Sequence, residues 1–215
     1  MSDLHGLEFV KPADIEARSF EIISHELGAR ALDPENELVI KRVIHTSADF
    51  DYLDNLVFSP HATSIGVRAL QDGCSIVTDT SMAAAGINKR VLARFGGRVH
   101  TFIGDEDVAA EAKERGLTRS AVCMERAAAL GEPLIFAVGN APTALVRLYE
   151  MLQAGQMACP PALIIGVPVG FVNVVESKEL ICSLDTPHIV ARGRKGGSNV
   201  AAAICNALLY IAREE

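Results

Sequence analysis

The sequence predicts an α/β fold: a doubly wound, mainly parallel sheet in three layers, flavodoxin-like, with additional helices at the N-terminus. From residue 75 onward, short apolar segments alternate with longer segments of helical periodicity, which is the pattern of repeated strand–helix units. Aromatic residues make up only 5% of the chain and Trp is absent, so the core must consist of Ala, Val, Ile and Leu, which suits buried parallel strands. Five apolar segments of this kind indicate the flavodoxin-like strand order.

Three helices are predicted before the alternation begins, over residues 12–28, 34–44 and 62–70. Pro12 and Pro34 stand at first helical positions, where proline is favoured because no intrahelical hydrogen bond is lost there. Asp33 precedes Pro34 as the expected N-cap. The second helix therefore delivers His45 close to its C-terminal end.

The remaining elements follow from the alternation itself. The segments predicted to be strands are bounded by turn residues and cover residues 75–78, 99–103, 134–138, 162–167 and 188–191. Helices are predicted over residues 82–95, 107–130, 143–154, 174–184 and 198–213, with a break expected near Gly116. No linker, repeat or change of composition divides the chain, so a single domain is predicted over residues 1–215.

The predicted fold also says where a ligand should bind. Open parallel sheets bind ligands beyond the carboxyl ends of their strands, near the point where the strand order reverses. The loops at that edge are expected at residues 79–81, 104–107, 139–143, 166–172 and 192–198, and Gly and polar residues concentrate in them.

Composition and charge exclude several classes of function. A formal net charge of -7 argues against nucleic-acid binding, which needs a basic face, and requires any anion site to gather its cations locally. Residues 1–14 lack the apolar stretch of a secretion signal, and the apolar run over residues 162–172 is too short to cross a membrane, so a cytoplasmic protein is expected. The five Cys are widely spaced and are expected to be free thiols.

Residues 192–198, Arg-Gly-Arg-Lys-Gly-Gly-Ser, form the sharpest local pattern. Three cations and three Gly lie between the last predicted strand and the last helix, where Gly permits close approach to a ligand and the helix N-terminus adds positive potential. The segment matches neither the G-x-x-x-x-G-K-[ST] nor the G-x-G-x-x-G phosphate-binding pattern, so no nucleotide is inferred. It is interpreted as an anion-recognition loop, and the alternative is a solvated basic turn.

Four further segments could carry chemistry, each with a simpler structural alternative. His45 can exchange a proton near neutral pH, although the segment alone favours a histidine that only interacts with the carbonyl end of its helix. The helix start at residues 139–145 has amides that could hold an anion or a carbonyl, or could merely begin a helix. The loop at residues 166–173 could pack against a flat apolar ligand or form a tight turn, and Arg119 could bind a carboxylate or be a surface residue. The carboxylates at the strand ends show no spacing typical of a metal site.

Taken together, these segments resemble the precorrin-8X methylmutase family. The residues that carry the resemblance are, in chain order, Ile15-Glu16 with Ser19-Phe20, Arg42-Val43-Ile44-His45-Thr46 with Asp49, Asp79 with Met82 and Gly86-Ile87, Thr118-Arg119-Ser120, residues 139–145, residues 168–172 with Glu176 and Ser177-Lys178-Glu179, residues 193–198, and Asn206-Ala207-Leu208. They span about residues 12–209, and their number and order make the resemblance specific. Ser47 departs from the family pattern, in which a second Thr often follows the position of Thr46.

The resemblance implies an intramolecular methyl-transferring isomerase of cobalamin (vitamin B12) biosynthesis. Members of the family move a methyl group from carbon 11 to carbon 12, on ring C of precorrin-8X or cobalt-precorrin-8, and give hydrogenobyrinic acid or cobyrinic acid. The reaction needs no cofactor and no methyl donor, and the His that matches His45 acts as the general acid. The resemblance also implies a homodimer with the site near the subunit interface, and hand-over of the corrin to neighbouring pathway enzymes is expected.

The residues expected to bind the corrin substrate come from the first predicted helix, from the segment that follows the second, and from the loops and helix starts at the ligand-binding edge. They are Ser19, Thr46, Thr80, Met82, Arg119, Asn140, Thr143, Val169, Gly170, Arg194, Lys195, Gly196, Gly197 and Ser198, and no metal ligand is expected. A large apolar macrocycle with carboxylate side chains would need both the apolar loop and the cations in this set.

Two alternative functions remain open. A non-catalytic tetrapyrrole-binding or carrier protein would need the apolar loop and the basic segment but not His45. A flavodoxin-like FMN-binding domain would explain the fold, although the phosphate fingerprints and a Trp for ring stacking are missing.

Overall fold

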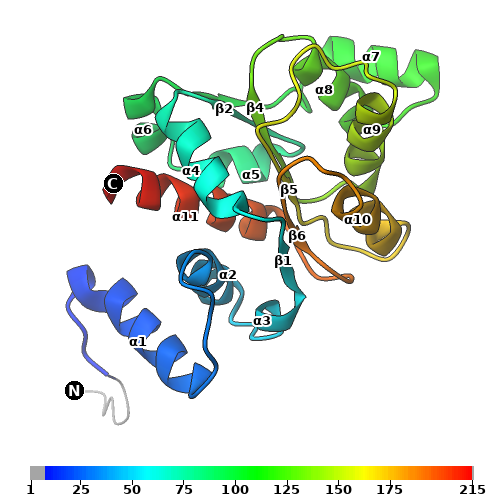
Figure 1. Cartoon of the computed structure of the whole chain (residues 1–215). Coiled ribbons are helices and arrows are strands. Elements are labelled where there is room, and N and C mark those ends of the chain that lie inside the picture. Colours follow the sequence, from blue (N-terminus) through cyan, green and yellow to red (C-terminus); the bar gives the residue numbers. More distant parts are fainter. Residues whose placement is uncertain (1–7, 215) are drawn as a thin grey trace, which may run out of the picture.

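A six-stranded sheet lies at the centre of the molecule (Figure 1). The computed structural model describes residues 8–214. Residues 1–7, which belong to the segment expected to lack a secretion signal, and residue 215 lie outside the described residues. That residues 1–215 form a single domain therefore stays a prediction.

All five predicted strands are present and parallel. They are β2 (Ser75–Thr78), β3 (Val99–His100), β4 (Leu134–Val138), β5 (Leu163–Gly166) and β6 (His188–Ala191). Their order across the sheet is β3-β2-β4-β5-β6, which is the flavodoxin-like order, so the predicted fold class is confirmed. The order reverses between β2 and β4, and the loops that follow these two strands are the expected place for a ligand.

The sequence does not predict the sixth strand. This strand, β1 (Leu56–Phe58), pairs antiparallel with β6 at the edge of the sheet and follows a short helix, α3 (Tyr52–Asn55). Three residues are too few to show the alternation by which a strand is recognised. β3 in turn is shorter than its predicted range of 99–103, and it pairs only with β2 at the opposite edge.

Helices cover both faces of the sheet, so the predicted three-layer arrangement is confirmed (Figure 1). Along β4, Ile135 and Ala137 belong to one buried cluster, whereas Leu134 and Phe136 belong to the other, because successive side chains of a strand point to opposite faces. The first cluster includes residues of α2 (Glu37–Ser47), α4 (Ala62–Gln71), α5 (Ser81–Gly86) and α11 (Ser198–Glu214), and the second includes residues of α7 (Glu106–Arg115), α8 (Arg119–Ala128), α9 (Pro142–Gln153) and α10 (Val174–Cys182).

The helix predicted over residues 82–95 is interrupted. It consists of α5, α6 (Lys89–Leu92) and a 3-10 turn (Ala93–Phe95). Asn206 of α11 occupies the interruption, where its amide donates to the Gly86 carbonyl at 2.9 Å and accepts from the Asn88 N–H at 2.8 Å. A side chain from the end of the chain therefore shapes this segment, and no local pattern could have predicted it.

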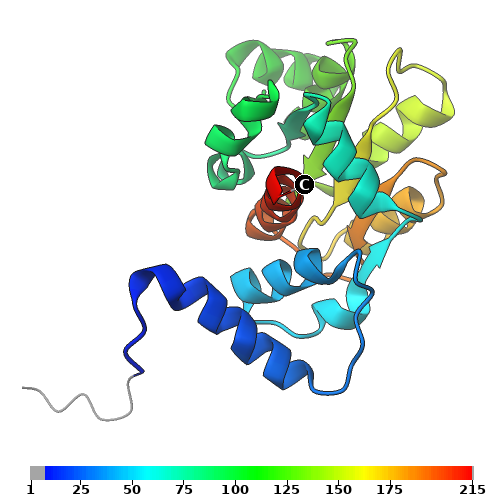
Figure 2. The ribbon, with the colours of Figure 1, turned by 60° about the vertical axis from the view of Figure 1, so that its left-hand side comes forward.

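The N-terminal helices also differ slightly from the prediction. α2 begins at Glu37, because the preceding residues form a turn in which the Asn36 N–H donates to the Asp33 carbonyl at 2.9 Å. α1 (Ile15–Leu27) lies at the periphery (Figure 2), and only Ile23 and Leu27 of it are buried. Every helix within residues 8–214 is too short or too polar to cross a lipid bilayer.

Candidate active site

His45 lies in the last turn of α2, beside the first turns of α11. Both helices contribute to a cavity of about 260 Å³, which is lined by Arg42, His45, Thr46, Gly86, Asn199, Ala202, Ala203 and Asn206. The His45 side chain is exposed, and its ring meets the Phe20 ring of α1 edge-on, with 5.7 Å between the centroids. Because α11 begins where the loop after β6 ends, the Asn199 end of this cavity lies at the carboxyl edge of the sheet, where the fold predicts a site, and the cavity extends from there along α11 to Asn206.

Arg42 lies one helical turn before His45 and ties three helices together. Its guanidinium stacks 4.3 Å from the ring centroid of Tyr210 in α11 and 5.3 Å from that of Phe20 in α1, while its Nη2 donates to Glu16 at 2.6 Å. The Nε of Arg42 is buried and has no hydrogen-bond partner in the described part of the chain. Arg42 belongs to a motif of the resemblance but was not among the predicted binding residues. Residues three apart on a helix lie on the same face, so this spacing could have placed Arg42 beside His45.

The loops after β2, β4 and β6 meet at Thr80 and Ser198. The two hydroxyl oxygens are 2.8 Å apart, and the Thr80 hydroxyl also accepts from the Ala83 N–H as the N-cap of α5. Gly139 packs against the same point, because a Cβ added there would lie 2.8 Å from the Ser198 Cα. Thr80 and Ser198, which the sequence singled out separately, are therefore brought into direct contact.

Asp79 occupies the backbone amides that the sequence offered to a ligand. Its buried carboxylate accepts from the N–H groups of Gly139 at 2.8 Å, Asn140 at 2.9 Å and Ala141 at 2.7 Å. Burial raises the pKa of the Asp79 carboxyl, and the three N–H donors act in the opposite direction. Of the two interpretations of this helix start, the one in which these three amides are free to hold an anion or a carbonyl of a ligand is therefore wrong, since an internal carboxylate already takes them.

The side chains of this helix start remain exposed. Asn140 and Thr143 both face solvent, and the Thr143 hydroxyl lies 2.8 Å from the hydroxyl of Thr118, the N-cap of α8. Arg119, the next residue, is also exposed, and its Nη1 donates to the Ile103 carbonyl at 3.4 Å. This group lies in the layer of α8 and α9, on the opposite face of the sheet from α2 and His45.

The backbone of residues 192–197, which we call the basic loop, is held by hydrogen bonds from a buried lysine. Lys178 of α10 is fully buried, and its Nζ donates to the carbonyls of Gly193 and Lys195, both at 2.8 Å. Burial lowers the pKa of Lys178 to about 8, because a charged amine loses its hydration. The loop also packs against the segment after β5, since a Cβ at Gly196 would lie 2.1 Å from the Val167 carbonyl oxygen. Lys178 was not among the predicted site residues.

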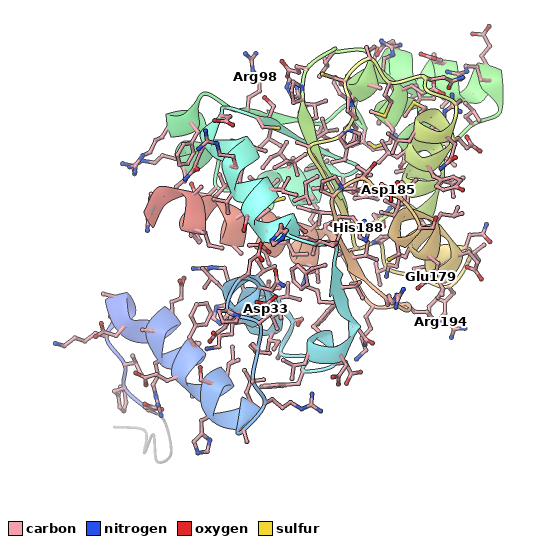
Figure 3. All side chains as sticks on the ribbon, in the orientation of Figure 1. Asp33, Arg98, Glu179, Asp185, His188 and Arg194 are labelled. Carbon is pink, nitrogen blue, oxygen red and sulfur yellow. The ribbon has the colours of Figure 1, made fainter. Side chains whose placement is uncertain are left out.

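The three cations of the basic loop have different partners. Arg192 pairs with Glu179 of α10 at 3.1 Å, and Lys195 pairs with Asp49 and Asp51. Arg194 pairs with no carboxylate of the described residues, and its guanidinium carbon lies 5.5 Å from the ring centroid of Phe171. Figure 3 shows Arg194 at the edge of the molecule, beyond the end of β6. The loop thus presents one cation beside an exposed aromatic ring.

Comparison with known proteins identifies the family and its fold. A family model described as precorrin-8X methylmutase matches residues 14–211. The chain belongs to the precorrin-8X methylmutase family. The cobalt-precorrin-8 methylmutase of Salmonella typhimurium is 49% identical over 212 residues, which cover 95% of this chain and 97% of the relative. The precorrin-8X methylmutase of Pseudomonas aeruginosa is 43% identical, with 90% of this chain and 93% of the relative covered.

A solved structure of the family has the same fold. The precorrin-8X methylmutase of Thermus thermophilus superposes with a TM-score of 0.85 at 37% identity, and the match covers 94% of this chain and 98% of that one. The resemblance inferred from the motifs, and the isomerase class that it implies, are thereby confirmed.

Within this family fold, the predicted binding residues fall into separate groups. Thr46 lines the His45 cavity, whereas Ser19 lies on α1, where its hydroxyl donates to the Ile15 carbonyl at 2.9 Å within the helix. Met82, in the first turn of α5, is 72% exposed, and Phe171, beside the predicted Val169 and Gly170, is 82% exposed. Large apolar side chains are thus exposed on the start of α5 and on the loop after β5.

A larger cavity elsewhere is a poorer candidate for an anionic substrate. It has a volume of about 490 Å³ and lies beside the start of β6, near Asp185 and His188 (Figure 3), and its lining contains no Lys or Arg. No group of three or more potential metal ligands occurs among residues 8–214. The five Cys are free thiols, as predicted.

Proposed function

We propose that this protein moves a methyl group from carbon 11 to carbon 12 of ring C of the corrin precursor, with His45 as the general acid. The substrate is precorrin-8X or cobalt-precorrin-8, the two names carried by the relatives of the chain, and the product is hydrogenobyrinic acid or cobyrinic acid. The observation that carries the proposal is the exposed His45 ring in a cavity at the carboxyl edge of the sheet, in a chain of this family.

His45 supports the reaction by supplying one proton. Histidine exchanges protons near neutral pH, and protonation of ring C withdraws electron density from the macrocycle, which eases migration of the methyl group. The proton returns when the product forms, so the mass does not change. The Phe20 ring packs edge-on against the imidazole, and Arg42 holds the helix that carries Phe20 against α2.

A large flat macrocycle explains why the binding residues are spread along one edge. We propose that the carboxylates of the substrate contact Arg194 and Arg119, and that its ring packs on the exposed apolar residues of the loop after β5. Substrate contacts are proposed for Ser19, Thr46, Thr80, Met82, Arg119, Asn140, Thr143, Val169, Gly170, Arg194, Gly196, Gly197 and Ser198. Lys195, which the sequence also predicted to bind the substrate, is paired with Asp49 and Asp51 and is not among these contacts. The proposal includes a cytoplasmic homodimer that passes its corrin to neighbouring pathway enzymes.

The experiment is an absorbance time course of the purified protein with precorrin-8X and, separately, with cobalt-precorrin-8. Conversion to the spectrum of the product, at unchanged mass, is the expected result, and His45→Ala should bind the substrate but not convert it. Conversion by His45→Ala at the wild-type rate would remove His45 from the general-acid role. Binding without conversion of either substrate by the wild type would instead favour the non-catalytic tetrapyrrole-binding protein.

A further inference from the structure

Lys195 bridges the basic loop to the segment that directly follows His45. Its Nζ donates to the Asp49 carboxylate at 2.6 Å and to the Asp51 carboxylate at 2.6 Å. These partners lie more than 140 residues away in the chain, but only a few residues after His45. The bridge therefore joins the loop after β6 to the end of α2.

The carboxylate side of this bridge is a defined turn. α2 ends at Ser47, and its C-cap, Ala48, has a left-handed backbone with φ of 53°. The Asp49 Oδ1 accepts from the Asp51 N–H at 3.0 Å, while its Oδ2 accepts from Lys195. The hydrogen bond from Lys195 lowers the pKa of the Asp49 carboxyl, so that this group stays ionised.

The lysine side of the bridge is fixed at its backbone. The Lys195 carbonyl accepts from the buried Lys178 ammonium at 2.8 Å, and the next residue, Gly196, has its Cα directly against the Val167 carbonyl. A continuous series of contacts thus runs from the sheet interior through the loop backbone and the Lys195 side chain to the turn after His45. Lys195 is thus bonded at its backbone carbonyl and at its ammonium, so that it links the loop to this turn.

The charge at the bridge also disfavours direct contact with a carboxylated substrate. Lys195 brings one positive charge and the two aspartates bring two negative charges, so the cluster carries a net negative charge at neutral pH. A substrate carboxylate that approached it would meet two like charges. Arg194, without a carboxylate partner in the described residues, has no such conflict.

We propose that Lys195 is a positioning residue, which fixes the end of α2, and with it the His45 imidazole, relative to the basic loop that carries Arg194. The inference rests on the proposed function, because it assigns Lys195 to the placement of the general acid rather than to substrate binding. Displacement of a reacting group by about 1 Å can slow a reaction by about a hundredfold. Loss of the bridge should therefore slow the chemical step and leave substrate affinity nearly unchanged.

The test compares Lys195→Met with Arg30→Met. Lys195 is exposed, so the first variant should fold. Arg30 is a matched control, because it makes an exposed ion pair with Asp54 in the same region without contacting the basic loop. Lys195→Met should lower kcat by about ten- to a hundredfold with KM changed by less than about threefold, and Arg30→Met should change neither. Lys195→Arg should restore most of kcat, because a guanidinium can also bridge two carboxylates.

Hydrogen exchange provides a readout that does not depend on turnover. Amides of residues 45–51 should exchange faster in Lys195→Met than in the wild type or in Arg30→Met. A raised KM with kcat retained would overturn the proposal and make Lys195 a substrate ligand, and unchanged exchange together with unchanged kcat would also overturn it. If the wild type converted neither corrin while exchange still accelerated in the variant, the proposed function would fail although the bridge itself would be supported.

Discussion

Replacement of Lys178 by Met should remove a pH dependence from the stability of the protein. Lys178 is fully buried in α10, where its ammonium contacts loop carbonyls. Burial lowers the pKa of this amine from 10.5 to about 8, because the charged form loses its hydration and the carbonyl contacts only partly replace it. Met has a similar length and cannot titrate.

The size and sign of the effect follow from that pKa. The drop from 10.5 to about 8 corresponds to about 3 kcal/mol. Below pH about 8 the folded protein carries the full cost of the buried charge. Between pH about 8 and pH 10.5, the unfolded chain holds a proton on Lys178 that the folded protein has lost, so the free energy of unfolding rises with pH. Above about pH 10.5 neither state carries the charge.

Urea denaturation of the wild type and Lys178→Met, from about pH 7 to about pH 10.5 with a reductant present, measures the effect. The difference between the two free energies of unfolding isolates Lys178, because the other groups titrate in both proteins. The wild type should gain about 3 kcal/mol over the variant across this range, whereas exposed Lys113→Met should show no such trend. A constant difference for Lys178→Met would refute the reasoning, since the amine would then keep its proton in the folded protein.

Three further substitutions test the loops at the carboxyl edge. Gly196→Ala should lower the free energy of unfolding by about 2 kcal/mol, because its Cβ would lie 2.1 Å from a carbonyl oxygen, whereas Gly104→Ala has open space and should change little; urea denaturation compares them. Arg194→Gln should raise KM for the corrin about tenfold with kcat nearly retained, and steady-state kinetics showing an unchanged KM would contradict its role. Asp79→Asn should cost about 2 kcal/mol, because an NH₂ group would face backbone N–H donors; thermal unfolding equal to the wild type would contradict this.

The parallel core of the fold could be predicted because its information is local. Each of the five parallel strands is a short apolar segment between turn residues, and each lies close to its predicted position. β1 escaped prediction because its three residues gain their strand geometry from pairing with β6, through Leu56 opposite Ala191. The interruption after Gly86 was likewise hidden, because it depends on Asn206 at the other end of the chain.

The candidate site likewise has a part that local sequence predicts and a part that depends on contacts between distant residues. The motifs predicted the loops at the carboxyl edge and His45, because strand ends and helix ends can be inferred from neighbouring residues. The pairing between these loops could not be inferred, since Asp79 meets the amides of residues 139–141 and Lys195 meets Asp49 only after folding. A run of cations in a sequence therefore indicates where charge gathers, but not which of its members is already neutralised.

In the proposed function, the basic loop is the means by which an acidic protein offers a cation to a carboxylated substrate. The chain has a net charge of -7, and two of the three loop cations are paired with internal carboxylates. Lys178 fixes the loop backbone through hydrogen bonds to two of its carbonyls, and Lys195 joins the loop to the turn after α2. Arg194 is thereby presented beside the exposed Phe171 ring. A cation and an apolar ring side by side suit a flat macrocycle with charged side chains better than a small anion, because a small anion would gain nothing from the aromatic surface.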